Sequence, residues 1–412
     1  MAAFISAYQH ISSVLSLKKA WNSIEKRTRG YRRDTRGIDL ESINNFHRDS
    51  DNKIELISNS LRRNTPYVFS PLRAVLIDKA DGKLRVICVP TIRDRIIQRS
   101  ILEYLSQNDK CKLINDISYG FIKSIPGSPV KNVKSAVTRA KQLRKNYPWV
   151  YKTDITSFFD QIERTNLIKI IKSAVKTKSL HQILESTVRC EILEPSRSRQ
   201  DKIKKQGILH GRGIRQGMPL SPFFANLVLR DFDSKIIKNG YKAIRYADDL
   251  IFFSKDNETC YKIHEFCRDY LKSIGHTIPE LGEDTKTQII DPMSPAVFLG
   301  MGLSFSGTGY TLIVTEQQLK KIRNKILLNS SIKDLVANKI TLSKIGTKIN
   351  SELAGYLNAY EYADNHEQVY KCLRKWKTEV FKKIFENQLG INITSLGREE
   401  IIFLELENDF YN

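Results

Sequence analysis

The sequence lacks the features that would direct a chain into a membrane or an oxidising compartment. No apolar run approaches the roughly 18 residues that a membrane-spanning helix needs, and no basic segment followed by an apolar core opens the chain, so no secretory signal is expected. The six cysteines are scattered without a Cys-x-x-Cys pair, which argues against a zinc knuckle and a disulfide scaffold. The seven histidines are dispersed as well, so a histidine-based metal site is not expected. We expect a cytoplasmic protein with reduced thiols.

Acidic residues are few beside the basic ones. The chain carries 67 Lys and Arg against 45 Asp and Glu, which gives a formal net charge of +22. Such an excess points to a polyanionic partner, and because no membrane segment is found, we expect nucleic acid rather than a membrane surface. The 412 residues, of which 41% are hydrophobic, suit two or three packed subdomains and exclude wholesale disorder.

Two segments concentrate the positive charge. Residues 1–36 are predicted to form an amphipathic helical lead with eight Lys or Arg and two Asp or Glu, and residues 195–206 form a polar connector with five Lys or Arg. A solvated surface is the ordinary explanation of such runs, but the charge of the whole chain favours phosphate contact at both.

Hydrophobic periodicity predicts both strands and helices. Apolar and alternating runs within residues 66–90, interrupted by an Asp-Gly turn at 81–82, predict a β-hairpin. A strand is expected at 149–155, and two short strands are expected on either side of 247–249. From about 315 to 388 the pattern is helical throughout. The fold class is therefore mixed α and β (α+β), with a helical C-terminal part.

Three acidic residues stand in or beside apolar strands, where acids are otherwise unfavourable. Asp248 and Asp249 occupy a tight turn between two such strands, and Asp154 closes a third. Carboxylates on neighbouring strands are typical ligands for the two divalent metals, about 3.5–4 Å apart, that catalyse phosphoryl transfer. A turn residue or a helix N-cap is the alternative for each acid. On neighbouring strands, Asp154 and Asp248 would share both metals.

The motifs around these acids resemble, in order and spacing, the finger and palm blocks of bacterial reverse transcriptases, from about residue 65 to 300. A Tyr-x-Asp-Asp tetrad alone is a weak signal, so the resemblance depends on the ordered series. The matching segments are Arg73 to Pro90 with Asp81-Gly82-Lys83-Leu84-Arg85-Val86-Ile87, Asp94-Arg95-Ile96-Ile97-Gln98, Ser118-Tyr119-Gly120-Phe121, Tyr151-Lys152-Thr153-Asp154-Ile155-Thr156-Ser157-Phe158-Phe159-Asp160, Gly213-Ile214-Arg215-Gln216-Gly217-Met218-Pro219-Leu220-Ser221-Pro222 with Ala225-Asn226, Arg245-Tyr246-Ala247-Asp248-Asp249, Lys286-Thr287 and Phe298-Leu299-Gly300.

The resemblance implies an α+β right-hand polymerase with fingers, a palm built on an antiparallel sheet, and a helical thumb. On the family's pattern, residues 1–64 would be a basic helical extension and residues 65–148 the fingers. Residues 149–310 would be the palm with a finger insertion, and residues 311–412 would be the thumb. The Lys-rich thumb helices would face the phosphates of a duplex.

The resemblance also implies the catalytic chemistry. Asp154, Asp248 and Asp249 would be catalytic, and the same three residues together with Ile155 would hold metal. Two Mg²⁺ ions are the expected cofactors, with Mn²⁺ as the alternative. The reaction implied is nucleotidyl transfer, in which a primer 3′-hydroxyl displaces pyrophosphate from an incoming nucleotide.

Further residues would bind the nucleotide and the primer. Lys83 and Arg85 would close over the triphosphate, where the developing pyrophosphate charge requires cations. Phe159, five residues after Asp154, would block a ribose 2′-hydroxyl and so favour dNTPs and DNA synthesis. The expected substrate-binding set is Lys83, Arg85, Ile155, Phe159, Gln216, Gly217, Tyr246 and Lys286.

The remaining roles are given with their alternatives. Gln216 would pack on the incoming sugar or base in a turn where Gly217 allows close backbone approach. Tyr246 would brace the primer end, and Lys286 would act near the triphosphate as a general acid. The alternatives are a solvated hairpin face for the finger cations, a core position for Phe159 and a helix surface for Lys286.

Among reverse transcriptases, the chain looks most like the stand-alone enzymes of bacterial anti-phage defence. A mobile group II intron enzyme would carry a longer tail, and neither an HNH endonuclease constellation nor an RNase H acid set can be assigned. The retron block Asn-Ala-x-x-His is missing at 132–136, and the retron Val-Thr-Gly is only echoed at 314–316. The expected function is an RNA-directed DNA polymerase that copies a non-coding RNA in defence.

Four alternatives stay open: a retron enzyme making RNA-linked single-stranded DNA, protein-primed or untemplated DNA synthesis, an RNA-dependent RNA polymerase, and an RNA-binding module with a decayed site. The expected partners are a non-coding RNA template and primer, dNTPs and the DNA product, with no membrane. A second copy of the chain or a partner protein is left open. The segments 1–36 and 195–206 are where we expect structured RNA to bind.

Overall fold

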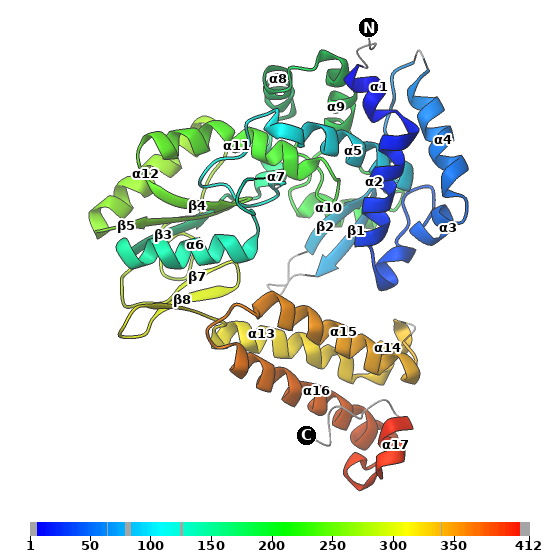
Figure 1. Ribbon diagram of the computed structural model, residues 1–412, viewed down its shortest axis with the longest axis vertical. Coiled ribbons are helices and arrows are strands. Elements are labelled where there is room, and N and C mark those ends of the chain that lie inside the picture. The colour runs from blue at the N-terminus through cyan, green and yellow to red at the C-terminus, as the bar shows by residue number, and fades with distance from the viewer. Residues whose placement is uncertain (1–5, 64, 79–83, 124–126, 339, 404–412) are drawn as a thin grey trace. The chain divides into compact units, whose positions relative to one another are not determined.

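The computed structural model describes residues 6–63, 65–78, 84–123, 127–338 and 340–403, and it divides the chain into two compact units (Figure 1). The larger unit comprises Met1–Val133 and Tyr151–Ile289, and the smaller unit comprises Lys134–Val150 and Ile290–Asn412. Both units are therefore assembled from segments that are not contiguous in the sequence.

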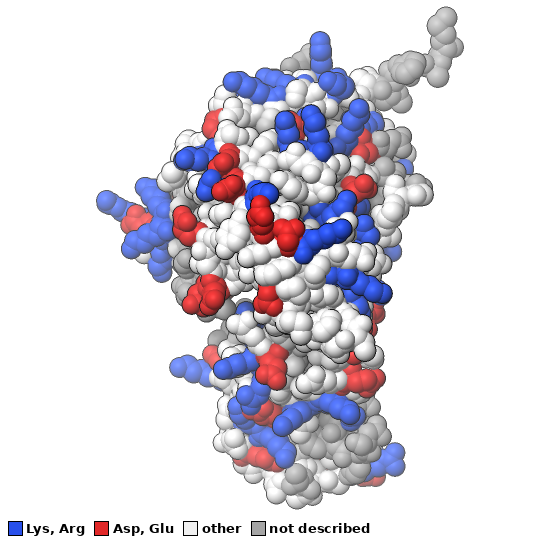
Figure 2. Space-filling view, turned by 90° about the vertical axis from the view of Figure 1, so that its left-hand side faces the viewer, with Lys and Arg blue, Asp and Glu red and all other residues white. Residues whose placement is uncertain are grey.

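The apolarity of the helices and the charge on the surface indicate which kind of partner the protein could bind. Nowhere in the described ranges is a helix long and apolar enough to cross a membrane. On the face drawn in Figure 2, Lys and Arg side chains are distributed widely, with Asp and Glu between them. On this face the positive excess is therefore spread rather than gathered into one patch.

Helices open the larger unit, as the periodicity of the lead predicts. Ser6 and Ser13 begin the first two helices by accepting hydrogen bonds from the main-chain N–H of Gln9 and Ser16. The second helix buries an apolar stripe, at three- and four-residue spacing, against its neighbours. The helices here are α1 (Ala7–Ile11), α2 (Val14–Arg27), α3 (Ile43–His47), α4 (Ser50–Leu61) and α5 (Ile92–Leu105), with 3₁₀ turns at Gly30–Asp34 and Gln107–Asp109.

The predicted β-hairpin is confirmed. Strands β1 (Arg73–Asp78) and β2 (Leu84–Val89) pair antiparallel, with Arg73 opposite Val89 and Asp78 opposite Leu84. The turn between them, including Lys83, lies outside the described residues. Alternation places Ala74 and Val86 on the buried face of this hairpin.

The main sheet carries the strands predicted around the acids. Its order is β4-β5-β3-β6, and β4 and β5 form an antiparallel hairpin in which Tyr246 lies opposite Asp249. Figure 1 shows α11 and α12 beside this sheet, and both pack on its outer hairpin. The strands are β3 (Trp149–Asp154), β4 (Lys242–Tyr246), β5 (Asp249–Ser254) and β6 (Gln288–Ile290), and the two helices are α11 (Ser221–Lys238) and α12 (Asn257–Ser273).

Between β3 and α11 the larger unit is helical. The connector expected at 195–206 forms a helix over most of its length. The helices are α7 (Phe158–Gln161), α8 (Arg164–Ala174), α9 (His181–Val188) and α10 (Arg197–Lys205), with a 3₁₀ turn at Lys178–Leu180.

The smaller unit combines a three-stranded sheet with the C-terminal helices. The helical periodicity predicted from about 315 is confirmed, so the α+β class holds in both units. Its elements are α6 (Val133–Asn146), β7 (Ala296–Phe298), β8 (Met301–Phe305), β9 (Tyr310–Ile313), α13 (Glu316–Leu327), α14 (Ile332–Ala337), α15 (Leu342–Tyr360), α16 (His366–Leu389) and α17 (Arg398–Phe403), with 3₁₀ turns at Leu328–Ser330 and Ile393–Ser395.

One buried arginine holds α6 in the smaller unit. The Arg144 guanidinium donates hydrogen bonds to the carbonyl oxygens of Leu303 at 2.5 Å, Asp291 at 2.9 Å and Ser294 at 2.7 Å. A fully buried guanidinium is tolerated only when its donors are satisfied, so these bonds fix the helix to a segment more than 140 residues away. The predicted subdomain boundaries at 64, 148 and 310 stay a prediction.

Candidate active site

The end of β3 meets the turn between β4 and β5. The main-chain N–H of Ile155 donates to the carbonyl oxygen of Asp248 at 3.2 Å, so the residue after Asp154 is bonded directly to the turn that carries the other two acids. Ile155 is buried and Asp154 has 14% of its side chain exposed. The structure thus brings together the three acids that the sequence singles out.

The turn itself has an unusual backbone. Ala247 lies in the left-handed region at φ +59°, where a residue other than glycine, Asn or Asp carries strain of order 1–3 kcal/mol. Strain of this kind persists only where the surroundings hold it. The main chain of Gly120 supplies one such support, because a Cβ there would lie 2.5 Å from the amide nitrogen of Ala247.

Replacing Gly120 by Ala is therefore expected to displace the turn. Overpacking of this kind typically costs about 1–3 kcal/mol, and a shift of about 1 Å in catalytic groups lowers a rate by roughly 100-fold. Steady-state nucleotide incorporation together with the melting temperature measures both effects. Gly355→Ala is the matched control, because no atom lies within 4 Å of a Cβ added there, and unchanged incorporation in both variants would contradict the role of Gly120.

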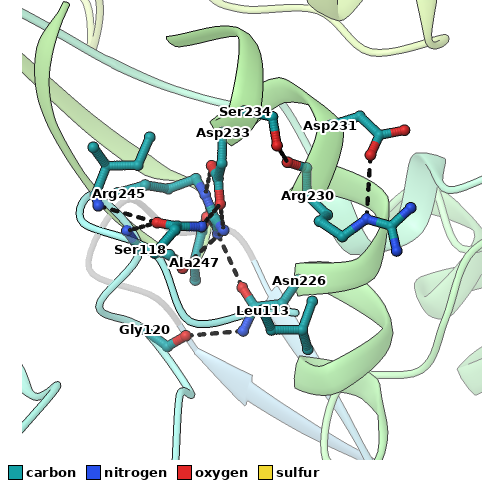
Figure 3. A network of polar contacts seen from close by, with 12 residues as sticks. Leu113, Ser118, Gly120, Asn226, Arg230, Asp231, Asp233, Ser234, Arg245 and Ala247 are labelled. Carbon is teal, nitrogen blue, oxygen red and sulfur yellow. Dashed lines mark hydrogen bonds and ion pairs between the residues drawn. The ribbon is translucent and has the colours of Figure 1, made fainter. Parts of the chain in front are cut away.

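Arg245 provides the second support, from inside the protein (Figure 3). Its guanidinium is 1% exposed and forms a two-pronged ion pair with Asp233, at 2.6 Å from Nε and 2.5 Å from Nη2. Nη1 donates to the carbonyl oxygen of Ala247 at 3.1 Å and to Oδ1 of Asn226 at 3.0 Å. Nη2 also donates to Oγ of Ser118 at 2.8 Å. The arginine that precedes the turn thus holds its strained residue by the main chain.

The segment around Ser118 is bonded to β4 like an additional strand. The Arg245 N–H donates to Ile117 O at 2.7 Å, and Tyr119 N–H donates to Arg245 O at 2.8 Å. Asn226 Nδ2 donates to the carbonyl oxygen of Gly120 at 3.0 Å, as Figure 3 shows. The motif blocks that are separate in the sequence therefore form one polar network behind the acids.

The three carboxylates repel one another. Burial raises the pKa of Asp248, and the charge of Asp154 adds to this rise. Asp249 keeps an exposed edge, yet desolvation by the surrounding protein, followed by the charges of Asp248 and Asp154, raises its pKa to about 6. The cations Arg85 and Lys286 act in the opposite direction on Asp248. For Asp248 and Asp249, burial and mutual repulsion therefore outweigh the attraction of the nearby basic residues.

Lys286 lies within this site. Its ammonium forms an ion pair with Oδ2 of Asp154 while 71% of its side chain is exposed. Burial lowers the pKa of Lys286, but the hydrogen bond to Asp154 and the charges of all three acids outweigh it and raise that pKa. Lys286 stands just before β6 rather than on a helix, so the alternative of a helix-surface lysine is wrong.

The donor set fits a hard divalent cation. Among the described residues, no three His, Cys, Asp or Glu side chains lie close enough to hold a metal by themselves. Mg²⁺ needs only one or two carboxylates and completes its shell with water and phosphate oxygens. Asp154 and Asp248 would supply them, with Asp249 next to Asp248 in the chain; Ile155 as a metal ligand stays a prediction. The ammonium on Asp154 and the raised pKa of Asp248 and Asp249 show that positive charge is favoured here.

The predicted nucleotide-pocket turn touches the hairpin β1–β2. The Cys88 N–H on β2 donates to the carbonyl oxygen of Gln216 at 2.7 Å. Gly217 has φ +108°, and a Cβ at that position would overlap the carbonyl oxygen of Cys88. Glycine is therefore required here for main chain to pass against main chain. Arg85, also on β2, has an exposed side chain whose charge acts on Asp248.

Phe159 is half-buried in α7 rather than a fully buried core residue. Its ring packs edge-on against Phe158 at 5.7 Å, and its carbonyl oxygen accepts from Ile214 N–H at 2.8 Å, which ties it to the Gln216 turn. Tyr246 is also half-buried, with its ring 6.1 Å from that of Phe121. Both rings thus keep accessible surface, while their predicted roles stay predictions.

Sequence reasoning missed Asp233 and the role of Arg245. Asp233 lies on the buried side of α11 between apolar neighbours. This position could have indicated a buried ion pair, because an acid on such a face needs a partner. The partner stands 12 residues later on another element, and no local pattern connects the two.

Residues 77–303, more than half of the chain, match the family described as "Reverse transcriptase (RNA-dependent DNA polymerase)". Protein YkfC of Escherichia coli (strain K12) is 29% identical over 295 residues, covering 62% of this chain and 72% of its own length. The group II intron-encoded protein LtrA of Lactococcus lactis subsp. cremoris is 25% identical over 259 residues, covering 62% of this chain.

The relatives differ in how much of their length the chain spans. It covers only 38% of LtrA. The Retron Ec83 reverse transcriptase of Escherichia coli is 26% identical over 185 residues, which is 44% of this chain and 52% of that protein. The family match runs from residue 77 to residue 303. It therefore contains the three acids, the turn at 216–217, strand β2 and the end of strand β1.

Proposed function

This chain belongs to the reverse transcriptase family, and on that premise we propose that it is an RNA-directed DNA polymerase that copies a non-coding RNA in bacterial anti-phage defence. One observation supports the polymerase most strongly. The hydrogen bond between Ile155 and Asp248 joins the end of β3 to the β4–β5 turn and so sets Asp154 beside Asp248 and Asp249. Carboxylates in this arrangement suit nucleotidyl transfer and have no need of a histidine or cysteine.

Different residues of the chain would have different roles in nucleotidyl transfer. Divalent ions, when bound, would supply the positive charge that activates a hydroxyl nucleophile and stabilises the transferring phosphate. Asp154 and Asp248 would hold the cations, and Arg85 on β2 would bind the triphosphate. Lys286 Nζ, which has a raised pKa and stays protonated at neutral pH, donates toward the leaving pyrophosphate. The Arg245 network keeps the acids in place throughout.

Phe159→Ala is expected to weaken the selection of deoxyribose. A half-buried ring beside the Gln216 turn would exclude a 2′-hydroxyl, and pocket contacts of this size discriminate by about 10–200-fold. The ratio of kcat/KM for dTTP and UTP on one template measures the effect. Phe159→Tyr keeps the bulk and should keep the ratio. An unchanged ratio in Phe159→Ala would support an RNA-dependent RNA polymerase or a core role instead.

The retron alternative has an observation of its own, the similarity to the Retron Ec83 reverse transcriptase. The departures at 132–136 and 314–316 speak for the defence enzyme. Sequencing the nucleic acid that co-purifies with the protein, before and after phage challenge, separates the two. DNA that changes length on ribonuclease treatment indicates an RNA-linked retron product, whereas free DNA copied from a non-coding RNA supports the proposal.

The defence role is tested in cells. Wild-type protein should reduce plaque formation, and the Asp248→Ala/Asp249→Ala variant should not. Protection that survives this change would contradict a defence polymerase and favour an RNA-binding module. A nucleotide adduct on the purified protein, detected by mass spectrometry, would instead indicate protein-primed synthesis.

A further inference from the structure

Helix α10 is built unlike the other helices of the larger unit. Of its nine residues only Ile203 is buried, and the rest are exposed. The helix carries five Lys or Arg and one acid, Asp201. It cannot be stabilised by an apolar face of its own, so its attachment to the protein depends on a few specific contacts.

These contacts join α10 to the hairpin β1–β2. Ile203 packs in one apolar cluster with Ala74 of β1 and Val86 of β2, and Figure 1 shows the helix beside both strands. Arg199 Nη2 donates to the carbonyl oxygen of Ala74 at 2.9 Å. Gln206, which ends the helix, accepts at Oε1 from the Leu84 N–H at 3.3 Å. One side of α10 is therefore fixed to the hairpin.

The opposite side presents unpaired cations. Arg197, Lys204 and Lys205 are spaced seven and eight residues apart, so they share the helix face that points away from Ile203. All three are exposed, and within the described ranges none of their side chains forms a hydrogen bond or an ion pair. Asp201 lies on the same face and leaves a net charge of about +2 there. Three cations along roughly 12 Å of helix suit a phosphate backbone.

The hairpin transmits this contact toward the acids. Leu84, bonded to Gln206, directly precedes Arg85, whose charge acts on Asp248. At the other end of β2, Cys88 is bonded to the carbonyl of Gln216. A ligand that immobilises α10 therefore restrains β2 next to the residue that faces the triphosphate.

We propose that α10 is a docking surface for the phosphate backbone of a folded RNA, and that RNA bound there restrains strand β2, which carries Arg85. The proposal rests on the proposed function, because it assigns RNA as the polyanion and Arg85 on β2 as a residue that binds the incoming nucleotide. It makes the enzyme responsive to a structured RNA that need not be the copied strand.

The docking is tested by RNA affinity. The Arg197→Ala/Lys204→Ala/Lys205→Ala variant should bind an RNA hairpin about 10–100-fold more weakly than wild type, with a log–log salt slope smaller by about 2–3. The control Lys235→Ala/Lys238→Ala/Lys242→Ala removes the same charge from exposed positions on α11 and β4 and should change affinity little. Equal losses in both variants, or an equal loss for a DNA hairpin of the same sequence, would overturn RNA docking on α10.

The coupling is tested by nucleotide affinity on poly(dA)/oligo(dT), so that the hairpin is the only RNA present. Adding the RNA hairpin should tighten apparent dTTP binding by about fivefold or more in wild type. By reciprocity, bound dTTP should tighten binding of the RNA hairpin by the same factor. Gln206→Ala removes the bond to Leu84 and no charge, so it should bind the RNA hairpin normally and show weaker coupling. Full coupling in Gln206→Ala would overturn it. If wild type incorporates no dTTP on poly(rA)/oligo(dT) either, the proposed function fails, and the affinity comparison still decides the docking.

Discussion

Replacing Asp248 by Asn should lower the rate of nucleotide incorporation by about 10³–10⁴-fold, since a metal ligand contributes several kcal/mol to the transition state of phosphoryl transfer. Asn has the same shape but binds Mg²⁺ weakly. The hydrogen bond from Ile155 goes to the main-chain oxygen of Asp248, so the substitution should leave the turn in place. Single-turnover incorporation at saturating dNTP measures the loss.

Stability distinguishes this effect from misfolding. Burial raises the pKa of Asp248 in the folded protein above that in the unfolded chain, so at neutral pH ionisation of this group favours unfolding. Removing the charge should therefore leave the metal-free melting temperature unchanged or raise it. Mg²⁺ should raise the melting temperature of wild type more than that of the variant. The control Asp269→Asn, at an exposed carboxylate, should retain the wild-type rate. A large loss of stability with Asp248→Asn would contradict this account.

Breaking the pair between Arg245 and Asp233 should destabilise the larger unit by about 3–5 kcal/mol, because removal of one partner leaves the other charge buried and unpaired. Asp233→Ala leaves the guanidinium and Arg245→Met leaves the carboxylate. Either variant should lower the melting temperature and the incorporation rate. The Arg245→Met/Asp233→Leu double variant removes both charges and should recover much of the stability.

Activity separates the two roles of Arg245. Of the two paired residues, Arg245 is the one that donates to the carbonyl of Ala247. The double variant should therefore regain stability without regaining the full rate of nucleotide incorporation. Arg245→Lys keeps the charge but not the planar fork, and it should lose more in rate than in melting temperature. If the double variant recovered stability and rate together, the network would be a core element without a role in holding the turn.

Hydrophobic periodicity and turn residues predicted those strands that are recognisable from neighbouring residues alone. The β1–β2 hairpin follows from apolar alternation around an Asp-Gly turn, and the strands beside 247–249 follow from apolar runs. Helix α10 shows the limit of this approach. Ile203 is its only buried residue, so the helix has no apolar periodicity and its sequence indicated a connector. Contacts with the β1–β2 hairpin, which is distant in sequence, attach this helix to the protein.

The site could be predicted only in part. Nothing local brings Asp154 to Asp248, 94 positions away, and the resemblance of ordered motifs supplied that link. The supports behind the turn escaped prediction for a physical reason. Asp233, Ser118 and Gly120 act through contacts with Arg245 and Ala247 that exist only once α11 and β4 have packed. Likewise Arg144 fixes α6 to a segment far along the chain.

The most direct test of the central claim is primer extension with purified protein, Mg²⁺ and dNTPs on an RNA template, a DNA template and no template. The account predicts that wild type extends the primer with the complement of the RNA template, that omission of template abolishes extension, and that Asp154→Asn and Asp248→Asn fail to extend. Extension that ignores the template, or that proceeds at the wild-type rate in both variants, would contradict an RNA-directed DNA polymerase built on these carboxylates.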